Sequence, residues 1–218
     1  MNRVLITLGA LGLAASLSAL ALAQAPVGSA GVGSVPAPGL ITGFQNYTQT
    51  YTAGYIGLAS AASATDVVCL AGSAAKTVAV TRIQLTGTAA TLVTLPITLV
   101  RRTSVDTGGT AASTTANPAN NIAKHDTNNA TAAAVPISYT ANPTIVDSSP
   151  TYLQTANITI PVTTAGTSIN PLSWTYGNIA TGEQPIILRG AAAQICLNFN
   201  AVTISTPLLT GSMTWYEY

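Results

Sequence analysis

The chain has 218 residues, of which seven are Lys or Arg and six are Asp or Glu, so charged residues make up only 6% of it. A nucleic-acid interface needs clustered cations to neutralise phosphates, and the only cationic doublet here is Arg101-Arg102, so the composition argues against nucleic acid as a partner. Polar character comes instead from uncharged residues, including 34 threonines. Copies of a protein with so little surface charge repel one another weakly, which favours association.

Residues 1–23 predict a secretory signal peptide. Arg3 precedes an uncharged run over residues 4–23 that ends in the small-x-small pattern of residues 21–23. This is a basic n-region, an apolar h-region and a cleavage site, with cleavage expected before Gln24. The alternative is a retained anchor, since a run of about 20 apolar residues can span a bilayer, and only then would the chain contact a membrane. Cleavage removes Arg3 and leaves six cationic against six acidic residues.

Residues 24–64 predict a flexible or extended N-terminal arm. Residues 26–40 mix Gly, Pro, Ser and Ala without periodicity, as linkers do. Tyr47, Tyr51 and Tyr55 follow at intervals of four, and the threonines between them favour extended chain over helix. Such a tyrosine stripe serves either as a platform for stacking on sugars or as an apolar edge packed on the domain.

Residues 65–218 predict a single antiparallel β-sandwich of jelly-roll type. Apolar residues alternate with Thr and Pro over residues 93–99, a period of two with one buried face. Pro96 cannot donate to a ladder, which indicates an edge position or a bulge. In residues 78–85 the apolar residues change parity midway, which predicts a bulge or a sharp twist near Thr81-Arg82.

Further alternating runs predict strands near residues 135–139, 158–162, 172–176 and 193–199. In the first of these runs, residues 135, 137 and 139 are expected to form the apolar face. Turns rich in Gly, Pro, Asn and Thr separate the runs, and no stretch after residue 40 has a sustained helical period. Eight or nine short strands in one domain are typical of an all-β sandwich, and we expect a jelly roll.

The two cysteines, Cys69 and Cys196, favour a disulfide in an exported chain. A structural zinc site would need histidines as well, and the chain has one. The alternative is two separately buried thiols, because cysteine is often a small core residue. Cys196 has the opposite parity to the apolar residues of its strand, so a disulfide would tie the outer side of that strand to residue 69.

His125-Asp126 is the candidate for chemistry, within a long segment over residues 105–133. A hydrolase would need a base oriented by a third group, but adjacent side chains in extended chain point apart, and no G-x-S-x-G motif is present. A calcium site would use the carboxylate of Asp126 with the side chains of Asn128 and Asn129, and one carboxylate is fewer than a calcium-binding loop supplies. The acids are too scattered for a glycosidase pair. We therefore expect a polar loop tip fixed by Asx-type hydrogen bonds from Asp126 and Asn128, and no catalytic residue, cofactor or metal.

The ordered series "VTRIQLTGTA", "ITLVRRTSVDTGGTA", "KHDTNNATA", "YTANPT", "PLSWTYG", "IILRGAAAQICLNFN" and "WYEY" resembles small all-β proteins encoded by tailed bacteriophages and prophages. The resemblance covers about residues 65–218. These proteins are uncharacterised virion-associated structural proteins. The resemblance implies a structural role and gives His125-Asp126 no catalytic role.

We therefore expect a non-enzymatic structural protein, secreted or displayed on a cell surface or virion. Its expected partner is itself or a larger particle, with a trimer favoured by jelly-roll analogy and with the arm and the 105–133 segment near the contacts. One alternative is a secreted carbohydrate-binding module that stacks on glycans, and a second is a secreted hydrolase. The candidate stacking aromatics are Tyr47, Tyr51, Tyr55, Tyr152, Trp174 and Tyr176.

Overall fold

The computed structural model describes residues 49–58, 65–109, 111–112, 122–147, 149–163, 171–204 and 208–218. Their elements, in chain order, are β1 (Gln49–Leu58), β2 (Asp66–Ala71), β3 (Val78–Thr88), β4 (Val93–Arg102), β5 (Thr107–Gly108), β6 (Ala111–Ala112), β7 (Ile122–Lys124), β8 (Val135–Tyr139), β9 (Pro143–Thr144), β10 (Thr151–Ile160), β11 (Leu172–Thr175), the 3-10 turn η3 (Ile179–Thr181), β12 (Ile186–Leu188), β13 (Gln194–Asn198) and β14 (Leu208–Glu217).

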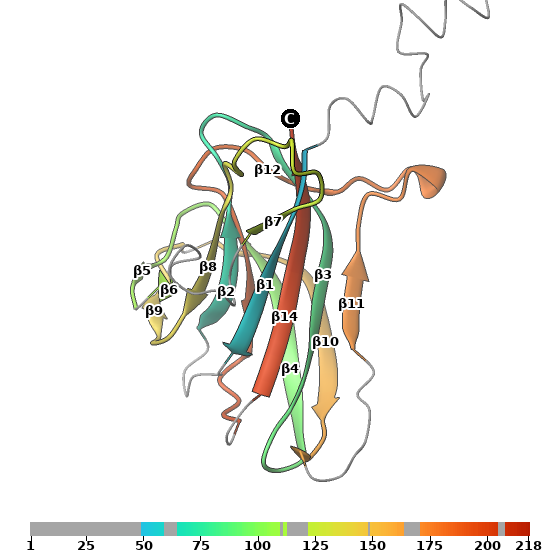
Figure 1. Ribbon diagram of the computed structural model, residues 1–218. Helices are drawn as coiled ribbons and strands as arrows, with labels where there is room; N and C mark the ends of the chain where they lie inside the picture. The colour runs from blue at the N-terminus through green and yellow to red at the C-terminus, as the bar shows by residue number, and fades with distance from the viewer. Residues whose placement is uncertain are drawn as a thin grey trace, which may run out of the picture. The chain divides into compact units, whose positions relative to one another are not determined.

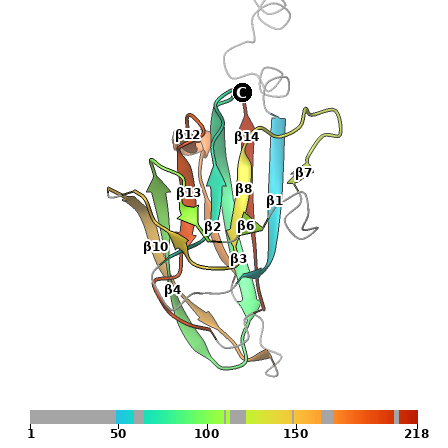
Figure 2. The same ribbon diagram turned by 90° about the vertical axis from the view of Figure 1, so that its left-hand side faces the viewer.

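These strands form two six-stranded sheets and one small two-stranded sheet, shown in Figures 1 and 2. The first, sheet A, has the order β11-β3-β14-β1-β7, with β12 also paired to β3. The second, sheet B, has the order β10-β4-β13-β2-β8-β6. Every pairing between named strands is antiparallel, so the predicted all-β antiparallel class is confirmed. Within the described part of the chain, no helix has the length and apolarity needed to cross a membrane.

The order of the strands is that of a jelly roll. Sheet A contains the run β1-β14-β3 followed by β11 and β12, and sheet B contains β2-β13-β4-β10. Along the chain, β1, β2, β3 and β4 alternate between the sheets, β10 stays in sheet B beside β4, and β11, β13 and β14 alternate again, as the two interlocked Greek keys of a jelly roll require. Residues 103–150 form one insertion between β4 and β10, which adds β5 to β9 around this framework.

The core lies between the inner faces of the two sheets and contains side chains from both. Alternation along β4 buries Leu95, Ile97 and Leu99 completely, as their period of two predicts. Sheet A contributes a matching set of apolar side chains, and the contacts form one contiguous cluster. The largest fully buried side chains in the described residues include Trp215, Tyr51, Tyr55, Phe199 and Leu70.

The predicted bulge in β3 is confirmed. Arg82 pairs with Thr214 on β14, whereas Trp215, the next residue, pairs with Val80. Thr81 is therefore the extra residue, and it reverses which parity of β3 faces the core. The Thr81 hydroxyl donates to the Thr214 carbonyl at 3.2 Å, which fixes the bulge in place.

Pro96 occupies a local edge, as expected. It pairs with Asn157 on β10, but β13 pairs with β4 only over Thr98 to Arg102, so no strand of the described chain lies on the other side of Pro96. The side chain of Asn200 takes that place, because its Nδ2 donates to the Pro96 carbonyl at 3.1 Å. The missing N–H of proline therefore costs no ladder hydrogen bond.

The prediction of a flexible arm as far as residue 64 is wrong for β1. Residues 49–58 are extended but pair with β14 along almost the whole strand and with β7 on the other side, so β1 is an interior strand of sheet A. Its buried face consists of Tyr51, Ala53 and Tyr55 at alternate positions, which is why it belongs to the core. Residues 1–48, with the predicted signal peptide and Tyr47, lie outside the described residues.

The expected apolar face of β8 is also wrong. Pro136 and Ser138 are buried, whereas Val135 is 51% exposed and Ile137 and Tyr139 are half-buried. Pairing of Cys69 with Ile137 places the odd residues on the outer side of sheet B, the side of the disulfide. The insertion covers part of the outer face of sheet B, so alternation alone does not identify the core side of β8.

Candidate functional site

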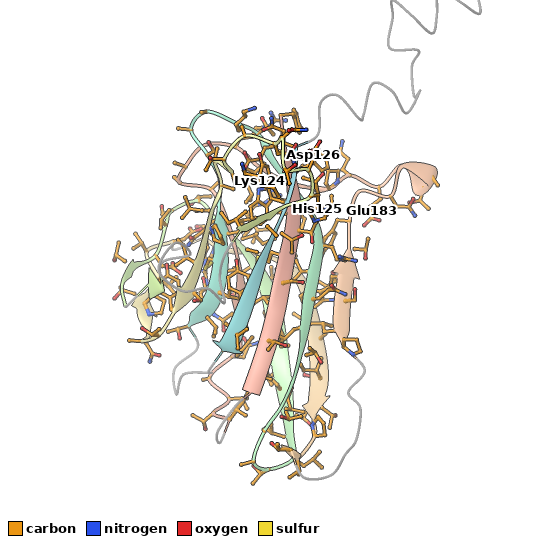
Figure 3. The ribbon with its side chains drawn as sticks, viewed as in Figure 1. Lys124, His125, Asp126 and Glu183 are labelled. Carbon is orange, nitrogen blue, oxygen red and sulfur yellow. A yellow bond between two sulfur atoms is a disulfide. The ribbon has the colours of Figure 1, made fainter. Side chains whose placement is uncertain are left out.

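His125 lies at one end of the sandwich, in the segment 125–134 that we call the His125 loop. Figure 3 shows its side chain with those of Lys124 and Asp126 at the end where β14 finishes. The loop is held to β1 by backbone and side-chain contacts: His125 N and Asn129 Nδ2 both donate to the Thr50 carbonyl, at 3.0 and 3.2 Å. Exposure of His125 and Asp126 agrees with the predicted loop tip.

The side chains of His125 and Asp126 have separate partners. His125 Nε2 lies 2.8 Å from the hydroxyl of Thr52, and that hydroxyl also lies 3.0 Å from the hydroxyl of Thr214. Asp126 Oδ1 accepts from Asn128 N at 2.9 Å, which is the expected Asx turn. A histidine beside a hydroxyl is one part of a nucleophile–base arrangement, but the carboxylate of Asp126 fixes the turn and does not orient the imidazole.

Glu217 fastens the other end of the His125 loop to sheet A. Its Oε1 accepts from Ala133 N, Ala134 N and Trp215 Nε1 at 3.0, 2.9 and 3.0 Å. The carboxylate is 1% exposed, and a buried carboxylate is tolerated because several donors replace its water. The Tyr51 hydroxyl adds a hydrogen bond to the Ala130 carbonyl at 2.9 Å.

Three of the five candidate stacking aromatics within the described residues are core side chains, so they form no platform for sugars, and Tyr51 and Tyr55 follow the packed alternative expected for the tyrosine stripe. Tyr51 and Tyr55 are 0% and 1% exposed, and Trp174 is 6% exposed. Tyr51 stacks on Trp215 inside the sandwich with ring centroids 5.8 Å apart, so its face is not open to a sugar. Tyr176 is half-buried and donates its hydroxyl to Gln154 Oε1 at 2.7 Å.

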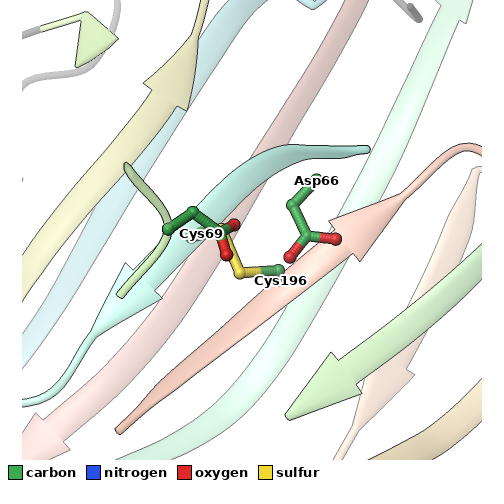
Figure 4. Close-up of side chains that lie close together, drawn as sticks. Asp66, Cys69 and Cys196 are labelled. Carbon is green, nitrogen blue, oxygen red and sulfur yellow. A yellow bond between two sulfur atoms is a disulfide. The ribbon is translucent and has the colours of Figure 1, made fainter. Parts of the chain in front are cut away.

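Cys69 and Cys196 form the predicted disulfide, drawn in Figure 4. They face each other directly on neighbouring strands, because Cys69 of β2 pairs with Cys196 of β13. Both are completely buried on the outer side of sheet B, away from the apolar faces of their strands, as the parity of Cys196 predicts.

Buried polar side chains lie beside the disulfide. We call Asp66, Arg102, Asp106 and Asn198 the Asp66 cluster, of which Asp66 and Asp106 lie nearest to the cysteines. Arg102 Nε donates to Asp66 Oδ2 at 2.9 Å, and its Nη2 donates to Oδ1 at 3.0 Å. Asn198 Nδ2 also donates to Oδ1, at 2.9 Å. A carboxylate has about four acceptor sites, so three of those on Asp66 are filled by a bidentate ion pair and one amide.

Asp106 is the unusual member of the cluster. It is 7% exposed, and neither carboxylate oxygen accepts a hydrogen bond from the described residues. Its carboxylate lies within 4.8 Å of that of Asp66. Burial and the charge of Asp66 raise the pKa of Asp106 to about 7, against the lowering effect of Arg102. The protonated form can donate to the acceptor site that remains on Asp66, and the ionised form cannot.

The start of the insertion covers the Asp66 cluster. Gln194 Nε2 of β13 donates to the Ser104 carbonyl at 3.2 Å, which places residue 104 over the outer face of sheet B. Asp147 closes the base of the insertion, since its carboxylate accepts from Thr103 N at 2.8 Å and Ser149 N at 2.9 Å. These two backbone donors also lower the pKa of Asp147.

The same residues could in principle be considered as a metal site, since ligand atoms of Asp66, Asp106, Cys69 and Cys196 lie within 4.8 Å of one another. The disulfide removes both thiolates, which are the sulfur form that binds metals. Asp66 is already engaged by Arg102. The cluster therefore offers one open carboxylate, well short of the six to eight oxygens that calcium takes.

The Asp66 cluster was not predicted from the sequence, although a signal for it exists. Asp66 directly precedes the apolar run "VVCLA", and the doublet Arg101-Arg102 follows the run "ITLV", in a chain with few charges. A rare charge beside a buried strand needs a partner of the opposite sign, which could have paired them. Asp106 and Glu217 carry no comparable local signal.

Comparison with models of protein families, with curated proteins and with solved structures finds no match for this chain. A proposal for its function therefore rests on the residues described above.

Proposed function

We propose that this protein is a non-enzymatic structural component that assembles with copies of itself on a surface, either of a phage-like particle or of the exporting cell. The placement of its few charges carries this proposal. Three of the six acidic residues, Asp66, Asp106 and Glu217, are buried, as is Arg102. The exterior is therefore even poorer in charge than the composition indicates.

A surface of this kind favours association. Net charge keeps copies of a protein apart, and the chain has a formal net charge of only +1. Large apolar side chains are exposed among the described residues, with Leu92 and Tyr152 at 67% and Ile56 at 64%. Exposed apolar groups on a neutral surface lose water favourably when another surface covers them.

Two further observations support the surface location. A disulfide persists in oxidising compartments and outside cells, which suits an exported or particle-bound protein. The resemblance to virion-associated proteins also favours a structural role. For the alternative, a secreted carbohydrate-binding module, Tyr51, Tyr55 and Trp174 provide no stacking platform because they are buried.

Sedimentation velocity of the full, oxidised chain over a range of concentrations tests the proposal. We expect oligomers whose share grows with concentration and changes little with salt, because the contacts are not between opposite charges. A single monomeric species up to tens of micromolar would contradict self-assembly, and glycan binding by that monomer would favour the carbohydrate-binding alternative.

A further inference from the structure

The two main sheets end in strands of very different length. At the edges of sheet A lie β7 with three residues, β11 with four and β12 with three. Sheet B ends on one side at β6, with two residues, and on the other at β10, with ten. Figure 2 shows β10 at the outer margin of its sheet. Among the strands described, β10 is therefore the long edge.

Nothing in the sequence of β10 protects that edge. Natural proteins guard edge strands with charge, proline, bulges or short length. The strand reads "TYLQTANITI" and contains no charged residue, proline or glycine. Its one irregularity is near the start, where the register with β4 shifts between Tyr152 and Gln154. From Gln154 to Ile160 the pairing is regular, so about half of the backbone N–H and C=O groups point to the free side.

The side chains of β10 suit a further strand at this edge. Ile158 and Ile160 are buried in the core and fix the strand in place. Thr155, Asn157 and Thr159 are exposed on the outer side. Threonine has high strand propensity, and uncharged side chains can pair across strands without repulsion.

We propose that β10 pairs antiparallel with β10 of a second copy of this chain, which joins two sheets B into one continuous sheet. This inference rests on the proposed function and names the surface through which the copies meet. An antiparallel pair of identical strands is self-complementary, as a two-fold interface requires. The near-neutral chain adds little repulsion, and Tyr152 and Leu153, 67% and 37% exposed, lie on the same strand.

The two-fold symmetry provides a sharp test. In an antiparallel pair of identical strands, a residue at the axis faces its own copy, and residues equally far on either side face each other. The regular part of β10 is centred on Asn157. Lysines at positions 155 and 157 would therefore place like charges across the interface, which destabilises strand pairing.

The experiment compares two double variants of the full chain by sedimentation velocity. Thr155→Lys/Asn157→Lys alters the free edge of β10, and Ser173→Lys/Thr175→Lys adds the same charges, at the same spacing, to exposed positions of the edge strand β11. We expect the β10 variant to associate about tenfold or more weakly than the wild type, and the β11 variant to associate as the wild type does. Near-UV circular dichroism checks that both variants fold.

The outcomes separate this inference from the proposed function. If the wild type assembles and the β10 variant assembles equally well, the β10 interface is wrong and the assembly function stands. If both variants weaken association alike, charge and not the edge is responsible, and the β10 interface is again wrong. If the wild type is a monomer, the function and the interface fail together. Should the β10 variant not fold, Asn157→Cys replaces it: cross-linking between copies supports the interface, and no cross-linking in the assembled protein overturns it.

Discussion

The middle of sheet B contrasts strongly with its β10 edge. Over the middle strands β2, β13 and β4, which we call the covered region, the insertion covers the outer face, and all five residues of β13 are buried. At the edge, the first five residues of β10 are exposed and its outer side has no neighbouring strand among the described residues. The covered region holds an ion pair and a disulfide, whereas β10 holds no charge.

This difference shows where the chain satisfies its own polar groups and where it leaves them for a partner. Buried charges need compensation within the chain, and Arg102 and Asn198 provide it for Asp66. The backbone groups at the free edge of β10 are satisfied by water in the monomer, and a second strand can replace that water. The covered region should therefore control the stability of the fold, and the open β10 edge should control association between copies.

Among changes in the covered region, removal of the disulfide should give the largest loss of stability. The bond links residues 127 apart in sequence, and closing a loop of that length contributes about 4–5 kcal/mol in the chain-entropy model. We expect Cys69→Ala/Cys196→Ala to lower the free energy of unfolding by about that amount, measured by urea denaturation. An unchanged urea midpoint in the double variant would show that the stability of the covered region does not depend on this disulfide.

Asp66→Ala, in the covered region, should lower the free energy of unfolding by about 3–5 kcal/mol, because it leaves the buried guanidinium of Arg102 without its ion-pair partner. Asp126→Ala is the matched control, since the Asp126 carboxylate is exposed and only fixes a turn. Its cost should stay near 0.5 kcal/mol. Similar losses in both variants, measured by chemical denaturation, would contradict the difference between buried and exposed carboxylates.

The pKa of Asp106, which lies in the covered region, predicts how the stability of the fold depends on pH. The folded chain raises this pKa from 3.8 to about 7, so the folded state binds the proton more tightly than the unfolded state. The stabilisation is complete below about pH 4 and is lost as the pH rises to about 7. Allowing for solvent screening, we expect a difference of about 1–2 kcal/mol between pH 4 and pH 8.

Asp106→Asn should remove this part of the pH dependence, because asparagine does not titrate. The comparison is between the slopes of unfolding free energy against pH for the two proteins. A wild-type protein whose slope matches that of Asp106→Asn would show that Asp106 titrates alike in the folded and unfolded chains.

Changes at exposed positions should have the smallest effect on folding. Thr155→Lys/Asn157→Lys replaces exposed side chains, so the unfolding free energy of the monomer should change by about 0.5 kcal/mol or less. His125→Ala should be similarly small, because its side chain contacts only the hydroxyl of Thr52 at an exposed position. Thermal melts of the dilute protein check both, and a large loss of stability in either variant would show that the replaced side chains support the fold.

Local patterns in the sequence predicted much of the framework. The alternation around Leu95 and Ile97 gave the buried face of β4, and the change of parity located the extra residue at Thr81. The parity of Cys196 placed the disulfide on the outer side of sheet B. Each of these features depends on neighbours along one strand, which a single sequence records.

Features that depend on long-range contacts were not predictable in this way. Asp106 and Asp66 lie 40 positions apart, and their proximity follows from how the insertion folds over sheet B. The assignment of β1 to the arm failed because its tyrosines have the same spacing in an exposed stripe and in a core strand. The outer face of β8 was misassigned because sheet B is partly covered on both sides.

The most direct test of the account is amide hydrogen exchange of β10 in dilute and concentrated protein. Amides from Gln154 to Ile160 that face the free edge should exchange rapidly in dilute protein and become protected at concentrations where sedimentation detects oligomers. Amides of β11 should exchange at the same rate in both samples. Exchange in β10 that is identical in the monomer and in the oligomer would contradict pairing through this edge.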